Sequence, residues 1–171
     1  MKYEDYLKEG IIQTLAKSEY DRYINFHNNA YKDDLNTANK LSTLSPRWII
    51  ISGYYAMHDI TKLYLGKKYG LKISERMVHS AAIAALRKVL EDKKEREKAI
   101  KLLEDAKRIY DLFESRLKEK ILPTILKKGR SEREKAQYYQ ADYSRIMFDK
   151  ALFFLEGIVK PYIKLIEDML K

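Results

Sequence analysis

The segment from Ser45 to Gly70 allows very few folds. Its start is typical of a helix, because the Ser45 side chain can accept an amide hydrogen bond and Pro46 needs no amide partner in the first turn. Its end is also typical, with Lys67 and Lys68 in the last turn before a glycine stop. Nearly every face between these ends is apolar or aromatic. A helix that is apolar all round has to be enclosed by other helices, so this segment predicts the central helix of a bundle.

Two helical stretches are expected before the central helix. Apolar side chains recur at helical spacing across residues 18–41, and Ser18 with Asp21 offers a capping box at the start. Residues 3–16 carry a similar apolar pattern. They predict a preceding helix, which is either separate from the next one or continuous with it.

Three more helices are expected after the central one. Their starts are marked by residues that cap helix N-termini, and these are Ser74, Asp92 and Ser131. The first reaches about Leu90, the second ends or bends at Pro123, and the third bends at Pro161 before an amphipathic tail. The prediction is therefore one all-α domain over residues 1–171, an up-and-down antiparallel bundle of about five helices.

Composition narrows the class of protein. At 171 residues, with 46% hydrophobic and 35% charged residues, the chain suits a single globular domain. No apolar run approaches the roughly 20 residues that span a bilayer, and the first residues lack the apolar core of a secretory signal. We therefore expect a cytoplasmic protein with no membrane association. The lack of cysteine excludes disulfides and thiolate chemistry, and the abundance of Lys, Glu and Ile is compatible with a thermophilic source.

Surplus positive charge gathers in two stretches of a chain whose net charge is +9. Residues 62–76 hold five basic side chains against one acidic, and residues 118–135 hold seven against three. In an up-and-down bundle two helices separate these stretches, so both are expected at one end, where they would suit contacts with RNA phosphates. Lysines that cap helix ends and keep the surface soluble are the alternative explanation.

The three histidines show no metal-binding spacing. His58 lies in the middle of the central helix beside tyrosines, where a hydrogen-bonded core or interface histidine is favoured over a ligand contact. His79 lies in the first turns of the next helix and is expected to be more exposed. His27 follows Arg22 on the helix at 18–41, a spacing that suits an Arg/His pair but is also common by chance in a basic chain. No metal or other cofactor is predicted.

Several of these segments together resemble one family. They are the run Tyr54–His58 on the central helix, the helix start at His79, and the runs Ala141–Tyr143 and Ala151–Leu155 on the last helix. In this order and spacing they resemble the HEPN family (higher eukaryotes and prokaryotes nucleotide-binding) over about residues 18–160. The resemblance implies a small helical bundle that binds nucleotides or cleaves RNA. It also implies a homodimer formed through the late helices, and a small nucleotidyltransferase as partner in a toxin–antitoxin pair.

The catalytic pattern of that family is missing from its usual place. Members that cleave RNA use an arginine followed after four to six residues by a histidine near the start of the late helix, and the late helix here has no histidine. Arg133 and Arg145 are followed instead by tyrosines or Asp149, which cannot replace imidazole as a proton carrier at neutral pH. The resemblance therefore favours a non-catalytic module that binds a nucleotide, RNA or a partner protein over an enzyme.

Two alternatives stay open. The first is a metal-independent, toxin-like ribonuclease with a displaced site at Arg22 and His27. The second is a structural helical subunit of a nucleoprotein assembly. Residues 138–158 are apolar and aromatic on nearly two sides, which is compatible with a partner interface. The candidate nucleotide- or RNA-binding residues are Arg47, Tyr55, His58, His79 and Arg145, with the basic residues Lys67, Lys68, Lys127, Lys128 and Arg130.

Overall fold

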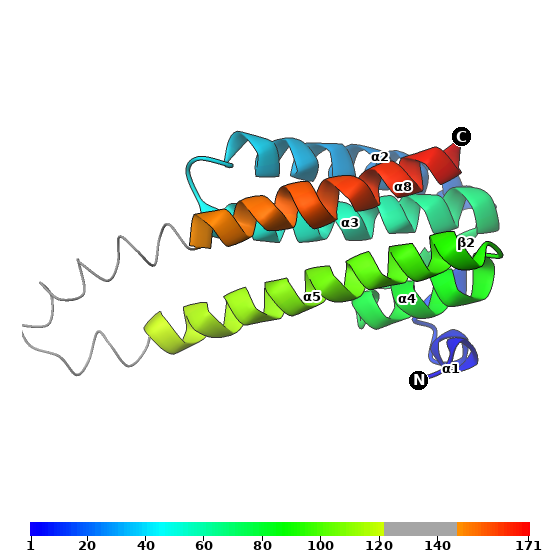
Figure 1. Cartoon of the computed structure of the whole chain (residues 1–171). Coiled ribbons are helices and arrows are strands. Elements are labelled where there is room, and N and C mark those ends of the chain that lie inside the picture. The colour runs from blue at the N-terminus through cyan, green and yellow to red at the C-terminus, as the bar shows by residue number, and fades with distance from the viewer. Residues whose placement is uncertain (122–146) are drawn as a thin grey trace, which may run out of the picture.

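A computed structural model of the chain describes residues 1–121 and 147–171 (Figure 1). The described elements, in chain order, are α1 (Tyr3–Lys8), β1 (Ile12–Thr14), α2 (Lys17–Lys40), α3 (Pro46–Tyr69), β2 (Leu71–Ile73), α4 (Val78–Val89), α5 (Lys93–Ile121), the π-helical turn η1 (Leu155–Val159) and α8 (Lys160–Leu170). Residues 147–154 are also helical and run directly into η1 and α8. We call this continuous stretch of residues 147–170 the last helix.

The predicted all-α bundle is confirmed. The long helices lie side by side in Figure 1, and the β structure among the described residues is a single two-stranded pair. α3 contacts α2, α4, α5 and α8, and 15 of its 24 residues are buried, which makes it the central helix. Both expected caps are present, since the Ser45 hydroxyl accepts a hydrogen bond from the Trp48 amide and Gly70 adopts the left-handed conformation with φ of +62°.

The expected helix over residues 3–16 is wrong in its second half. Only α1 is helical, and the chain then turns at Gly10, whose φ of +66° favours glycine. β1 follows and pairs antiparallel with β2, with Ile12 opposite Ile73. Ile11 and Ile12 are buried against the core. Their apolar pattern therefore belongs to a short strand, because a run of this length does not distinguish a helix from a strand.

Two helix starts also differ from the expectation. α2 begins at Lys17 with Ala16 in the cap position, so Ser18 is not the cap and no side chain caps this end. α4 begins at Val78 rather than at Ser74, because the residues directly after α3 form β2 and the chain then needs several residues to reach the start of α4. Helix propensity around Ser74 is overridden by strand pairing with a segment far away in the sequence.

The expected break between α4 and α5 is confirmed. The Asp92 carboxylate accepts a hydrogen bond from the Glu95 amide at 2.7 Å, as a capping residue should. The Arg96 guanidinium folds back and donates to the Leu90 carbonyl at 2.7 Å, which satisfies a carbonyl at the end of α4. Both contacts are local in sequence, which is why the break could be recognised from the residues alone.

The expected grouping of the two basic stretches at one end is wrong for the part of the second stretch that the structure describes, residues 118–121. After β2 the chain returns along α3, since the Lys62 ammonium pairs with Glu75 at 2.7 Å and Tyr54, two turns earlier, contacts His79. α4 then starts beside Tyr54 and ends beside α1, where Lys88 pairs with Glu4 at 3.7 Å, so it runs in the same direction as α3 (Figure 1). α5 then runs the opposite way, so it ends at the end of the bundle opposite to that where α3 ends (Figure 1). The first basic stretch and the described beginning of the second thus lie at opposite ends.

The last helix approaches α3 closely at Gly53. A Cβ atom at this position would lie 2.9 Å from Val159 Cγ2 and 3.0 Å from the Phe154 ring. Val159 closes η1, and Pro161 follows on the next turn. Proline has no amide for the helical hydrogen bond and its ring crowds the preceding turn, and a wider π turn just before it relieves this crowding. The irregularity expected at Pro161 therefore takes the form of η1.

Some expectations fall outside the described residues. These are the capping box at Ser131, the helix end at Pro123, the run Ala141–Tyr143, Arg133, Lys127, Lys128, Arg130 and Arg145. Over the two described ranges, every helix is either too short or too polar to cross a bilayer.

We expect the substitution Gly53→Ala to destabilise the fold by about 1–2 kcal/mol net. The new methyl group overpacks the contact with the last helix, which costs up to about 3 kcal/mol. The higher helix propensity of alanine returns about 1 kcal/mol of this cost. Chemical denaturation of both proteins measures the difference. Gly157→Ala is the matched control, since there the nearest atoms belong to the exposed Phe153 ring, which can move. A Gly53→Ala variant as stable as Gly157→Ala would contradict the close approach.

Candidate functional site

Three helices bring phenol and imidazole rings together in one cluster. Tyr54 and His58 lie one turn apart on α3, so they share a face of that helix. The Tyr54 hydroxyl lies 3.2 Å from Nδ1 of His79 on α4, and the Tyr54 ring stacks on Tyr110 of α5 at 4.4 Å between centroids. The His58 ring meets the Tyr54 ring edge-on at 4.5 Å. We call Tyr54, His58, His79 and Tyr110 the ring cluster.

His58 is held in the ring cluster without hydrogen bonds. Its side chain is only 3% exposed, and both ring nitrogens are buried with no hydrogen-bond partner. Burial lowers the pKa of His58 to about 3, and His79, Lys62 and Lys107 act in the same direction. The ring is therefore neutral at physiological pH. The prediction of a buried histidine is confirmed, but its expected hydrogen bond is absent among the described residues, which costs about 1–3 kcal/mol.

His79 is half-buried and also neutral. Burial lowers its pKa to about 4, Lys107 acts in the same direction, and Asp111 partly opposes them. Lys107 and Asp111 form an ion pair on α5 next to the cluster. Burial also raises the pKa of the Tyr54 phenol, so this group stays protonated. The cluster thus offers neutral rings and no proton carrier poised near pH 7.

One side of α3 is open beside the ring cluster. α4 starts next to Tyr54 and covers only the later part of α3, and within residues 1–121 and 147–171 no other helix covers the earlier part on this side. Trp48 and Tyr55, two turns apart, are 48% and 49% exposed there. The Arg47 guanidinium lies 5.9 Å from the Trp48 ring centroid. We call Arg47, Trp48, Tyr55 and Tyr110 the α3 open face.

Tyr110 links the α3 open face to the ring cluster. Burial raises the pKa of Tyr110 to about 12, with contributions from the nearby charge of Tyr55 and a hydrogen bond to it. Tyr110 and Arg47 also line a hollow of 90 Å³ between α3 and α5. The structure therefore brings together four predicted residues, which are Arg47, Tyr55, His58 and His79.

Two residues of this surface were not predicted. Trp48 is the only tryptophan of the chain and follows the helix cap, which is a signal in the sequence, but its exposure depends on how far α4 extends. Tyr110 belongs to the apolar stripe of α5, a pattern typical of core positions. Its ring is half-buried and stacks on Tyr54 at the edge of the core.

Arg22 and His27 do not form a joint site. His27 is only 4% exposed, its Nδ1 lies 2.7 Å from Asp59 Oδ1, and the rings of Tyr23 and Phe26 pack edge-on against it. The exposed Arg22 side chain lines a hollow of 250 Å³ on the surface of α2, which His27 does not line. An RNA phosphate bound by Arg22 would not reach the imidazole without movement of these rings.

The remaining candidates lie elsewhere. Lys67 and Lys68 are exposed at the far end of α3, away from the ring cluster. In the described part of the chain, no three His, Cys, Asp or Glu side chains gather where they could hold a metal ion.

We expect His58 to make the fold sensitive to acid. Its pKa is about 6.5 in the unfolded chain and about 3 in the fold, so the unfolded state takes up the proton first. Above pH 6.5 the His58 ring is neutral in both states and adds no charge-burial penalty, and this penalty grows as the pH falls toward 3. The free energy of unfolding should drop by up to about 1.4 kcal/mol per pH unit in this window for this residue.

The variant His58→Leu tests this assignment. It removes both unpaired nitrogens, so it should raise the free energy of unfolding at pH 7 by about 1–2 kcal/mol and flatten its decline below pH 6.5. Denaturation curves from pH 8 to pH 4 measure both effects, and subtraction of the wild-type curve removes the contribution of the carboxylates. A variant with the wild-type pH profile would show that His58 is not the acid-sensitive group.

Comparison of the sequence with protein-family models and with curated proteins gives no match, and neither does a search of solved structures. The function therefore has to be argued from the α3 open face and the ring cluster themselves.

Proposed function

We propose that the chain is a non-catalytic HEPN-like module that binds single-stranded RNA on the α3 open face. The observation that carries this proposal is the half-exposure of Trp48, beside the Arg47 guanidinium, and of Tyr55 two turns further along α3. Exposed aromatic rings stack on bases of any sequence, and arginine pairs with phosphate or stacks on a base. The net charge of +9 supports an anionic partner.

The protonation states support binding rather than cleavage. His58 and His79 are neutral, buried or half-buried, and directed into the ring cluster. The ribonuclease alternative at Arg22 and His27 has weaker support, because His27 is enclosed by Tyr23 and Phe26. A structural role in a nucleoprotein assembly stays a prediction, and it is compatible with an RNA-binding face.

The implied partners also stay predictions. The homodimer and the nucleotidyltransferase partner come from the family resemblance, as do the toxin–antitoxin context and the nucleotide as ligand. Residues 138–158 are compatible with a partner interface, and the described part of this range exposes Leu152 and Phe153. A cytoplasmic location and a thermophilic source stay predictions as well.

Trp48 allows a direct binding experiment. It is the only tryptophan, so its fluorescence reports on the α3 open face alone. We expect a single-stranded oligouridine of about ten nucleotides to quench this fluorescence, and the affinity to fall as salt is raised. Arg47→Ala and Tyr55→Ala should each weaken binding about five- to tenfold, since each removes one charged or stacking contact worth about 1 kcal/mol.

Tyr20→Ala is the matched control, because Tyr20 is a partly exposed tyrosine at the start of α2, at the other end of the bundle. Its affinity should equal that of the wild type. Fluorescence anisotropy of labelled RNA checks that quenching and binding agree. The proposal fails if Arg47→Ala and Tyr55→Ala bind the oligouridine as tightly as Tyr20→Ala does.

A further inference from the structure

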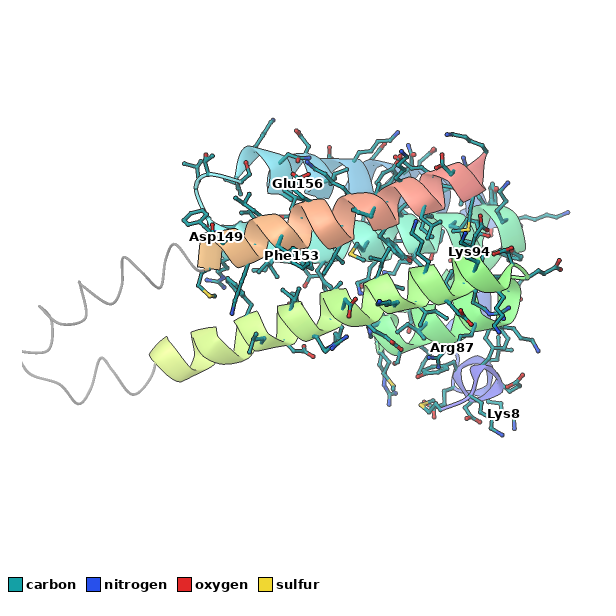
Figure 2. All side chains as sticks on the ribbon, in the orientation of Figure 1. Lys8, Arg87, Lys94, Asp149, Phe153 and Glu156 are labelled. Carbon is teal, nitrogen blue, oxygen red and sulfur yellow. The ribbon has the colours of Figure 1, made fainter. Side chains whose placement is uncertain are left out.

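A second surface lies between α5 and the last helix. Two hollows of 590 Å³ and 210 Å³ both include Ile109 of α5 and Phe153 of the last helix among their lining residues. They therefore form one continuous open groove. Figure 2 places Phe153 on the side of the last helix that faces α5. We call this surface the α5 groove.

The α5 groove has an apolar floor, and the Phe153 ring on it is exposed to solvent. Its apolar lining residues are Leu102, Ile109, Leu112, Phe113, Met147, Phe153 and Ile158. Phe153 is 64% exposed, which is unfavourable for so large an apolar ring in the absence of an occupant. Gly157 of η1 leaves room beside the ring, since an added Cβ would lie 3.3 Å from it. The groove can thus take apolar side chains on either side of Phe153.

The rim of the α5 groove is basic. Lys98, Lys101, Arg108 and Lys150 line it, and Asp105 is the acidic lining residue. Asp105 is already paired with Arg108. The three lysines form no ion pair among the described residues. An occupant of the groove therefore meets unpaired positive charge on both sides of an apolar floor.

We infer that the α5 groove binds an amphipathic, acidic helix of a partner protein. A groove between two helices accepts the apolar face of a third helix, whose anchors recur at i, i+3, i+4 and i+7. Acidic side chains at the edges of that face would pair with the lysines of the rim. The groove follows α5 from Lys98 to Phe113, which is about 22 Å and matches a helix of about 16 residues.

A second copy of the chain fits this groove less well. A symmetric dimer brings the same patch of both subunits together, so the basic rims would face one another. The chain carries a net charge of +9, which adds repulsion. Charge complementarity thus points to an acidic partner. This inference does not rest on RNA binding, because the α5 groove and the α3 open face share none of their defining residues.

A pair of designed peptides tests the inference on the full chain. Both are fluorescein-labelled helices of about 16 residues with leucines at i, i+3, i+4 and i+7 spacing. One carries glutamates at the flanking positions, and the other carries lysines there. Fluorescence anisotropy should show saturable binding of the acidic peptide, at least tenfold tighter than that of the basic peptide, and weaker at high salt.

Variants assign the binding to the α5 groove. Phe153→Ala removes the exposed ring and should lower the affinity for the acidic peptide at least tenfold. The double variant Lys98→Glu/Lys101→Glu should lower this affinity by a similar factor and should raise the affinity for the basic peptide. Misfolding would not produce such a reversal. Leu7→Ala removes an exposed apolar side chain on α1, away from the groove, and should leave both affinities unchanged.

Three results would overturn the inference. The first is equal binding of the acidic and basic peptides, and the second is an unchanged acidic-peptide affinity in Phe153→Ala. The third is a concentration-dependent dimer that Phe153→Ala dissociates and the acidic peptide does not, because the groove would then belong to a second copy. Arg47→Ala should leave peptide binding intact, so failure of the RNA proposal remains distinguishable from failure of this one.

Discussion

The fold depends on the close enclosure of α3, and two glycines allow it. At Gly66 a Cβ atom would lie 3.0 Å from Ile24 and 3.1 Å from Tyr23, both on α2. At Gly53 a Cβ atom would lie 2.9 Å from Val159 on the last helix. The missing side chains let two helices approach the same central helix on different sides. Enclosure on several sides removes the apolar faces of α3 from water, which is the dominant favourable term for such a bundle.

The length of α4 determines what remains outside this enclosure. α4 runs along α3 in the same direction, because the β1–β2 pair holds the chain at the end of α3 before it returns toward Tyr54. A helix of 12 residues cannot cover a helix of 24, so α4 leaves the first part of α3 without a covering helix on this side among the described elements. Trp48 and Tyr55 are exposed for that reason. The α3 open face is thus a consequence of topology rather than of a local motif.

The sequence predicted those features of the fold that depend on residues three or four positions apart in the chain. The caps at Ser45, Gly70 and Asp92 are such features, and the all-round apolar character of α3 required a bundle. It did not predict β1, because a strand of three residues carries too short a pattern to outweigh the helical spacing around it. The wrong start of α4 has the same origin, since strand pairing joins segments about sixty residues apart.

In the candidate site, too, the sequence predicted local features and missed contacts between separate helices. His58 could be expected inside, since it lies on an apolar helix, but its lack of hydrogen-bond partners depends on which side chains three separate helices supply. The pairing of His27 with Asp59 joins α2 to α3 and was hidden for the same reason. The half-exposed rings of the α3 open face required knowing where α4 begins. Residue types indicated the chemistry of the site, and only the packing showed which of them meet.

α5 connects the two proposed surfaces physically. Successive residues on a helix point about 100° apart, so neighbouring positions face different sides. Tyr110 faces α3, and Ile109 faces the last helix. Phe113 lies between them, because it lines both the hollow beside Arg47 and the α5 groove. The buried Phe113 ring therefore separates the hollow beside Arg47 from the α5 groove, and the two proposed surfaces lie on adjoining sides of one helix.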